Sequence, residues 1–361
     1  MKQEPRAYGG ISGFMLKVAR QSIPVSQEAF AETLAVDPTT VQSWESGRRP
    51  LGAATMTQVR RLGRQLLRLG VDSELVAMIP VAIEADLIIT AIATPVPDGE
   101  LGQHPLAGCV MDLRISELLT WALTGVPPRI ASRIPPVRRR GPAPTRPELG
   151  WIDRKQLNAN LLQLSDRGEQ DGSTLLLRSQ ACFLTGLARL DTPAKLSTAA
   201  SRYLVGGESW SPSWLDARSH VVSCAYRGDP EPLRRFITHA QESDDCETAA
   251  LNYTAYWVGD MPDREGDDGF MPRNLLRWRG SRMYPHLVER LQTTHPLIDL
   301  NTHNLWLLLR SQRGLIIDDK QTSLLLLDRI DEAADSNRVS QQSLRELRSM
   351  KSALAELGYR K

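Results

Sequence analysis

Two helix-start signals, eleven positions apart, constrain the N-terminal part of this chain more tightly than any other feature. Ser26 and Asp37 belong to the residue types that cap helix N-termini, and Pro38 stands at the first helical position, where its missing N–H costs nothing. An apolar residue precedes each cap, in the pattern of a hydrophobic staple. We therefore predict short helices over 27–34 and 38–45, separated by a turn of about three residues.

The helix predicted over 38–45 has two chemically different faces. At about 100° per residue, Val41, Trp44 and Glu45 share the face that would turn inward. The opposite face is uncharged, short and polar, which suits close approach to base edges in a major groove. Arg48 and Arg49 follow the helix, where they could hold phosphates. The polar face consists of Thr39 and Ser43, flanked by Thr40, Gln42 and Ser46.

The stretch SQEAFAETLAVDPTTVQSWESGRRP (26–50) resembles the DNA-binding domain of the Xre family, the lambda-repressor-like helix-turn-helix regulators. The resemblance covers about residues 14–70, including a first helix predicted over 14–21. The segments that carry the resemblance are SQEAFA (26–31), VQSWESG (41–47) and RRP (48–50). One position departs from the family, because Ala35 stands where many members have glycine. A left-handed Ala35 would cost about 1–2 kcal/mol, unless the turn takes another shape.

The resemblance implies roles for individual residues. The position of Gln27 contacts the DNA backbone or a base, and the helix that starts at Pro38 enters the major groove. Arg20 pairs with Glu45 inside the domain, so Glu45 is expected to be structural. Arg48 and Arg49 fix the register on phosphates. The expected DNA-binding residues are Gln27, Pro38, Thr39, Thr40, Gln42, Ser43, Arg48 and Arg49.

Helical periodicity, with few alternating strand patterns, predicts an all-α fold for the whole chain of 361 residues. We expect a helix-turn-helix domain over 1–70 and a helical segment, a candidate for dimerisation, over 71–126. A linker rich in proline and arginine follows over 127–150. A helical bundle or tetratricopeptide-like stack is expected over 151–361, with about eight to ten helices.

Charge is distributed unevenly, although the net charge is only +2. Residues 1–70 carry ten basic and five acidic side chains, whereas residues 71–137 carry three basic and eight acidic ones. In the linker, Arg138, Arg139 and Arg140 faintly resemble arms that insert into DNA minor grooves. Because the second arginine of an AT-hook core is missing, a solvated linker is the favoured interpretation.

Two other segments allow a functional and a structural interpretation. The helix predicted over 55–69 carries four arginines that could contact phosphates, but a solvated basic side is favoured. The aromatic segment 247–260 could line a ligand pocket, but core packing is favoured. The packed residues would be Val59, Leu62, Leu66 and Leu67 in the first segment, and Leu251, Tyr253, Tyr256 and Trp257 in the second.

No motif predicts catalysis, a cofactor or a metal. The sequence contains no GxxxxGK[ST], HExxH, GxSxG or strand-linked GxGxxG, its four cysteines form no CxxC pair, and its six histidines are scattered. The apolar stretch 75–94 is interrupted by Pro80, Glu84 and Asp86, and the N-terminus lacks the apolar core of a signal peptide. We therefore expect a cytoplasmic protein that is not an enzyme and does not enter a membrane.

These observations together predict a sequence-specific transcriptional regulator that binds double-stranded DNA. A homodimer is expected, since one helix-turn-helix reads few base pairs whereas a two-fold dimer reads two half-sites. The region 151–361 would sense a protein or small-molecule effector. The alternative is a protein-interaction scaffold or antitoxin-like component, whose helical C-terminal region binds a protein partner and whose DNA contact is secondary.

Overall fold

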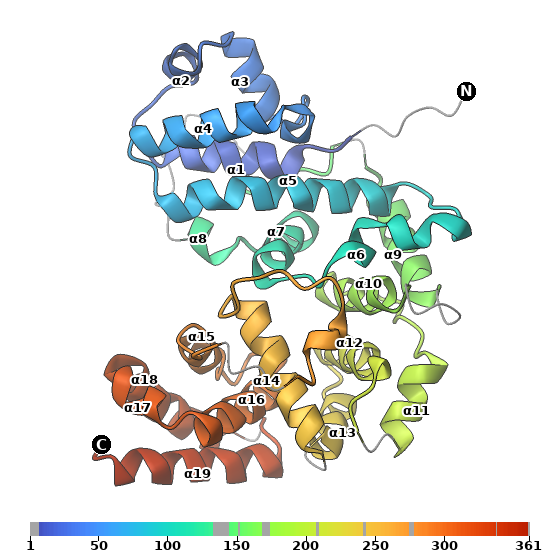
Figure 1. The fold of residues 1–361 in the computed structure, drawn as a ribbon, viewed down its shortest axis with the longest axis vertical. Coiled ribbons are helices and arrows are strands. Elements are labelled where there is room, and N and C mark those ends of the chain that lie inside the picture. Colours follow the sequence, from blue (N-terminus) through green and yellow to red (C-terminus); the bar gives the residue numbers. More distant parts are fainter. Residues whose placement is uncertain are drawn as a thin grey trace. The chain divides into compact units, whose positions relative to one another are not determined.

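The computed structural model describes residues 7–132, 144–150, 152–167, 174–206, 209–240, 243–273, 278–336 and 338–359. Within these ranges the chain forms 19 α-helices and no strand (Figure 1). The predicted all-α class is therefore confirmed. The helices fall into two compact units: an N-terminal unit, Met1–Pro105 with Leu113–Leu161, and a C-terminal unit, Leu106–Asp112 with Leu162–Lys361.

The N-terminal unit begins with three short helices that precede two longer ones. Its helices are α1 (Gly10–Gln21), α2 (Gln27–Leu34), α3 (Pro38–Glu45), α4 (Met56–Arg68), α5 (Ser73–Ala93), α7 (Leu113–Thr124), α8 (Arg129–Ser132) and the first part of α9 (Arg154–Asp166), with the 3₁₀ turns η1 (Leu51–Ala53) and η2 (Asp98–Gln103). The short helix α6 (Pro105–Gly108) starts at the last residue of the range Met1–Pro105.

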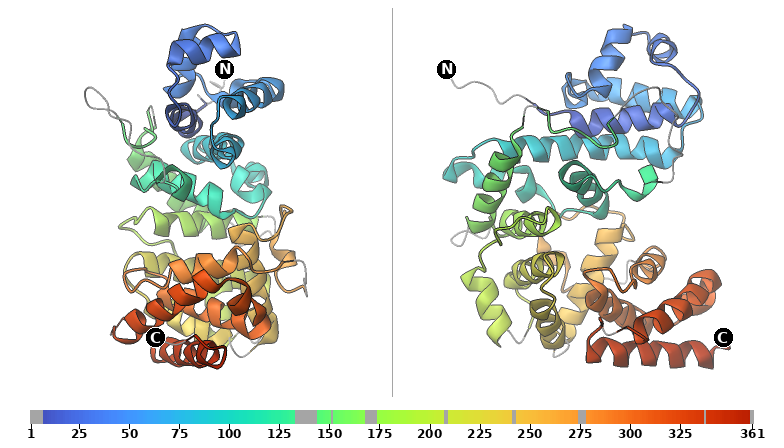
Figure 2. Two further views of the ribbon diagram at one scale, coloured as in Figure 1. Left: turned by 90° about the vertical axis from the view of Figure 1, so that its left-hand side faces the viewer. Right: turned by 180° about the vertical axis from the view of Figure 1, so that it is seen from behind.

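Helix α5, with 21 residues, is the longest helix of the N-terminal unit. It starts at its N-cap Asp72, whose side chain accepts a hydrogen bond from the N–H of Glu74, and it packs against α1, α4 and α7. Figures 1 and 2 show α1 lying alongside it. By length and composition alone α5 could cross a membrane, but 56% of its most apolar stretch is buried inside the protein. Such burial is typical of a core helix.

A buried carboxylate of α5 holds the start of α1. The oxygens of Asp86 accept hydrogen bonds from the N–H groups of Ile11 and Ser12, at 2.9 and 3.0 Å. These N–H groups lie in the first turn of α1, where no intrahelical partner exists and the helix dipole favours negative charge. Burial nevertheless raises the pKa of Asp86 to about 7, against the opposing effect of the hydrogen bonds from Ser12 and Ile11.

The C-terminal unit is built from helices that pack on sequence neighbours, such as α11 on α12 and α18 on α19, and on more distant helices, such as α10 on α12 and α16 on α19. Its helices are α10 (Leu175–Leu187), α11 (Thr198–Gly206), α12 (Pro212–Tyr226), α13 (Glu231–Ala240), α14 (Asp244–Val258), α15 (Met283–Glu289), α16 (Ile298–Ser311), α17 (Gly314–Asp318), α18 (Lys320–Ala334) and α19 (Gln341–Glu356), with the 3₁₀ turn η4 (Asp268–Phe270). The aromatic residues Tyr253 and Tyr256 of α14 are buried, as core packing predicts.

The units do not divide at the predicted linker over 127–150. Glu148, near the end of that stretch, accepts a hydrogen bond at its carbonyl from the Tyr8 hydroxyl, at 3.0 Å. The same unit continues into α9, where the Asn160 side chain donates to the carbonyl of Ile92 at 2.9 Å. Proline content predicts an extended chain but not whether that chain packs, and the N-terminal unit includes residues up to Leu161.

Two other sequence-based expectations concern the arginines of the linker and the packed face of α4. Arg138, Arg139 and Arg140 lie outside the described residues. In α4, Leu62 and Leu66 are buried, but Leu67 is 47% exposed and does not belong to the packed face.

Candidate nucleic-acid interface

The pair formed by α2 and α3 is defined by its two caps. The Ser26 hydroxyl accepts a hydrogen bond from the N–H of Ala29 at 3.2 Å, and α2 starts at the next residue. The Asp37 carboxylate accepts from the N–H of Thr39 at 2.8 Å, and α3 starts at Pro38. Both helices therefore have the bounds that the capping residues predict, because these signals are local.

The turn between the two helices contains a left-handed alanine. Ala35 has φ 53° and ψ 49° and ends α2. Its N–H donates to the carbonyl of Glu32, and the N–H of Val36 donates to the carbonyl of Ala31, each at 3.0 Å. This pair of hydrogen bonds is the Schellman pattern, which normally uses glycine. The turn thus keeps the ordinary helix-ending geometry at a backbone cost of roughly 1–2 kcal/mol.

The inward face of α3 is fixed by apolar burial and by an ion pair. Val41 and Trp44 are buried, and Glu45 is buried beside them. Arg20 of α1 binds Glu45 through two hydrogen bonds, Nε to Oε1 at 2.6 Å and Nη2 to Oε2 at 3.0 Å. Its Nη1 also donates to the carbonyl of Val25, at 2.8 Å, in the loop before α2. One guanidinium therefore joins α1, this loop and α3.

Gln27, a predicted DNA-contacting residue, forms a hydrogen bond with Glu45 of α3. Its Nε2 donates to Oε2 of Glu45 at 2.7 Å, and the side chain is half-buried. The first residue of α2 is thereby attached to the last residue of α3. In this conformation the amide supports Glu45, and only its remaining hydrogen-bonding capacity is available to a ligand.

Close packing between α1 and the end of α3 depends on a glycine that sequence reasoning missed. A Cβ atom added to Gly13 would lie 2.1 Å from the carbonyl oxygen of Trp44 and 3.0 Å from the N of Gly47. Backbone this close leaves no room for any side chain, so only glycine fits at position 13. The available signal was the glycine repetition in GGISG (9–13), which is unusual inside a helix.

The outward face of α3 is accessible and uncharged. The hydroxyl of Thr39 donates to Oδ1 of Asp37 at 2.6 Å, which leaves its methyl group and its acceptor lone pairs for another partner. Arg48 is oriented by a hydrogen bond from its Nε to the Ser46 hydroxyl at 3.1 Å, and neither Arg48 nor Arg49 forms an ion pair with a described residue. Pro38, Thr39, Gln42, Arg48 and Arg49 are exposed, and Thr40 and Ser43 are half-buried.

The basic side of α4 is also solvated. Arg60, Arg61, Arg64 and Arg68 are all exposed, and none forms an ion pair within the described part of the chain. The helix starts with a capping box in which Thr55 and Gln58 each bind the other's backbone N–H. Both earlier interpretations of this helix, phosphate contact and a solvated face, remain compatible with these positions.

No group of histidine, cysteine or acidic side chains suited to a metal ion occurs among the described residues. Comparison of the chain with protein-family models, with curated proteins and with solved structures gave no match.

Proposed function

We propose that this protein is a sequence-specific DNA-binding transcriptional regulator whose α2 and α3 act as a lambda-repressor-like helix-turn-helix. The observation that carries the proposal is the contrast between the two faces of α3. One face is fixed to α1 by Val41, Trp44 and the Arg20–Glu45 pair, while the other presents accessible, uncharged polar groups. A rigidly held helix with such a face suits the major groove, where short side chains approach base edges closely.

The roles of individual residues follow from their atoms. Thr39 offers a methyl group, suited to the thymine methyl, and acceptor lone pairs, since its hydrogen is bound to Asp37. Ser43 and Gln42 supply donors and acceptors one helical turn further. Arg48 and Arg49, free of carboxylates, would bind phosphates on either side of the groove. Gln27 and Glu45 would hold α2 and α3 at a fixed angle.

We further propose a homodimer. The outward face of α3 contains no arginine or lysine that could bind guanine through two hydrogen bonds, so the affinity of one half-site should be modest. A two-fold dimer would add a second half-site about 34 Å away along the same face of the duplex. Sedimentation of the protein with and without its selected duplex would measure this stoichiometry.

Selection from a random duplex library followed by fluorescence anisotropy tests DNA binding. We expect Thr39→Ala/Ser43→Ala to weaken binding to the selected sequence roughly 10- to 100-fold, because each base contact contributes about 1–3 kcal/mol. A matched double variant, Thr57→Ala/Ser73→Ala, changes exposed residues of α4 and α5 and should bind like the parent. Failure to enrich any sequence, or binding that does not weaken with salt, would contradict the proposal.

The same variants separate this function from that of a protein-interaction scaffold. In a scaffold, loss of the Thr39 and Ser43 hydroxyls would leave capture of the protein partner unchanged and impair only autoregulation. A regulator would lose control of its target promoters in proportion to the loss of duplex affinity.

A further inference from the structure

The C-terminal unit contains a cavity of about 790 Å³ at the meeting point of five segments. Its walls come from the turn after α10, the end of α12, the start of α13, the loop and first turn of α16, and the residue at 338 before α19. Cavities of roughly 300–1,000 Å³ are typical of small-molecule sites. All of these segments belong to the same compact unit.

The charges of this cavity do not balance. Arg189, Arg227 and Arg338 line it without forming an ion pair within the described chain, but the guanidinium of Arg227 is held by hydrogen bonds to Ser223 Oγ and Cys224 Sγ of α12. The fourth arginine, Arg234, is already neutralised, since its Nε binds Oδ2 of Asp299 at 2.8 Å and its Nη1 binds Oε1 of Glu231 at 2.6 Å. The other oxygen of the Asp299 carboxylate, Oδ1, accepts hydrogen bonds from the N–H of Ser340 at 2.9 Å and from the hydroxyl of Ser343 at 2.6 Å. Both oxygens of Asp299 therefore already have hydrogen-bond partners within the protein.

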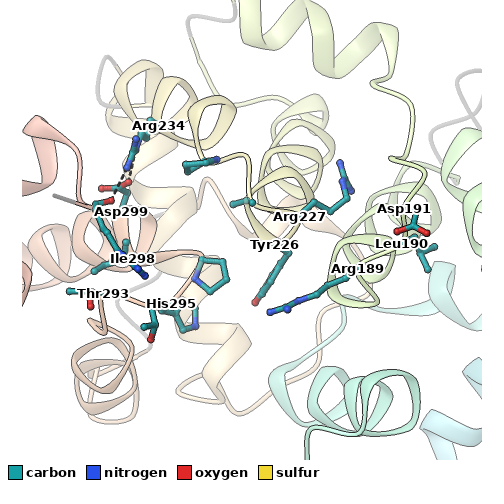
Figure 3. A pocket seen from close by; sticks show the side chains of 16 residues that line it. Arg189, Leu190, Asp191, Tyr226, Arg227, Arg234, Thr293, His295, Ile298 and Asp299 are labelled. Atoms are coloured by element: carbon teal, nitrogen blue, oxygen red, sulfur yellow. Dashed lines mark hydrogen bonds and ion pairs between the residues drawn. The ribbon is translucent and has the colours of Figure 1, made fainter. Parts of the chain in front are cut away.

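The remaining acid of the cavity does not cancel this excess. Asp191 is exposed, and Figure 3 shows its side chain pointing away from the guanidinium of Arg189. Two lining arginines, Arg189 and Arg338, therefore have no side-chain partner among the described residues, and Asp191 is the one lining acid outside the Arg234–Asp299 pair. An excess of unpaired guanidinium groups in a concave site attracts anions, because low-dielectric walls strengthen their field.

Neutral groups of the cavity are donors as well. In His295, Nδ1 accepts a hydrogen bond from the N–H of Leu297 at 3.1 Å, which places the ring proton on Nε2. Burial, and then Arg290, lower the pKa of His295 to about 4, so the ring remains neutral near pH 7. Figure 3 shows Tyr226 and Arg189 extending toward the side of the cavity where His295 lies.

The backbone of Arg189 is strained at this site. Its φ of 50° makes it, with Ala35, one of two described non-glycine residues in the left-handed region. This conformation costs about 1–2 kcal/mol. It ends α10 in the Schellman pattern, in which the N–H of Arg189 donates to the carbonyl of Gly186 at 2.9 Å and the N–H of Leu190 donates to the carbonyl of Thr185 at 3.2 Å.

We propose that this cavity binds a small phosphorylated molecule. Arg189 and Tyr226 would bind its phosphate at one end, and Arg338, placed beside Arg234 by the hydrogen bond from Arg234 Nη2 to its carbonyl at 2.8 Å, would bind a second anionic group at the other. Guanidinium groups bind phosphate oxygens through paired hydrogen bonds. The volume exceeds that of a single phosphate and accommodates a nucleotide-sized molecule. This site does not depend on DNA binding.

Isothermal titration of the full-length protein with pyrophosphate, ATP and citrate, without DNA, tests the site. We expect ATP and pyrophosphate to bind, and Arg189→Gln/Arg338→Gln to weaken them at least tenfold. Arg235→Gln, which removes one positive charge at an exposed position of α13 outside the cavity, should change the affinity less than twofold.

Each result decides the proposal. Absence of binding at millimolar pyrophosphate and ATP, or equal binding by the double variant, would overturn it. Tighter binding of citrate than of either phosphate compound would refute the phosphorylated class in favour of a carboxylate ligand. Circular dichroism and thermal unfolding of each variant show whether the fold is retained. Glutamine is chosen because it keeps the Cβ and Cγ methylene groups of arginine and removes only the charged end.

Discussion

Replacement of Ala35 by glycine should stabilise the turn between α2 and α3. The left-handed conformation of Ala35 costs about 1–2 kcal/mol, and glycine adopts it freely. Glycine also gives the unfolded chain more freedom, which offsets roughly 0.4–1 kcal/mol. The net gain should be about 0.5–1 kcal/mol, since both hydrogen bonds of the turn involve backbone groups that the substitution leaves in place.

Hydrogen exchange measured by mass spectrometry locates this gain. Amides of α2 and α3 should exchange about two- to fivefold more slowly in Ala35→Gly, because a tenfold change in an equilibrium corresponds to about 1.4 kcal/mol. Urea unfolding of the full-length protein, followed by tryptophan fluorescence, should shift to a higher midpoint without a change in slope.

A glycine of the same kind provides the matched control. Gly70, after α4, has φ 89°, and a Cβ added there would meet nothing within 4 Å. Gly70→Ala therefore introduces the backbone cost alone and should destabilise by a similar amount. If Ala35→Gly instead loses stability, or Gly70→Ala gains it, the assignment of strain to this turn is wrong.

Three further predictions concern the helices around α3. Gly13→Ala should cost at least about 1–3 kcal/mol, measured by urea unfolding, because its Cβ would meet the Trp44 carbonyl oxygen at 2.1 Å; an unchanged midpoint would exclude the close approach. Arg20→Met should cost about 3–5 kcal/mol and abolish duplex binding, since it leaves Glu45 buried without its cation; stability equal to the parent would show that the pair is dispensable. Asp86 takes up a proton more readily when folded, so its contribution is complete below its unfolded pKa, near 3.8, and is lost as the pH rises through about 7. The stability of the parent relative to Asp86→Asn should therefore fall by up to about 1.4 kcal/mol per pH unit between pH 4 and 7, and a rising difference would reverse the sign.

Local signals made the helices of the N-terminal unit predictable. Ser26 and Asp37 determine where α2 and α3 begin because a cap acts on backbone groups within three residues. The 100° periodicity likewise identified Val41, Trp44 and Glu45 as the inward face. Periodicity failed at Leu67, since it does not state how wide a face the neighbouring helices cover.

Contacts between distant segments were not predictable. The cavity of the C-terminal unit joins Arg189, Tyr226, His295 and Arg338, which are separated by tens of residues and share no motif. Packing of the chain around Glu148 against Tyr8 likewise leaves no trace in local composition.

The two ends of α1 are each held by a polar contact, Asp86 at its start and Glu45 at its end through Arg20. At 1.5 Å per residue, these twelve residues make a strut about 18 Å long. A tilt of α5 would therefore be transmitted to α3 through α1. A change in the angle of α5 would therefore change the direction in which the exposed Thr39 and the half-buried Ser43 present their hydroxyl groups.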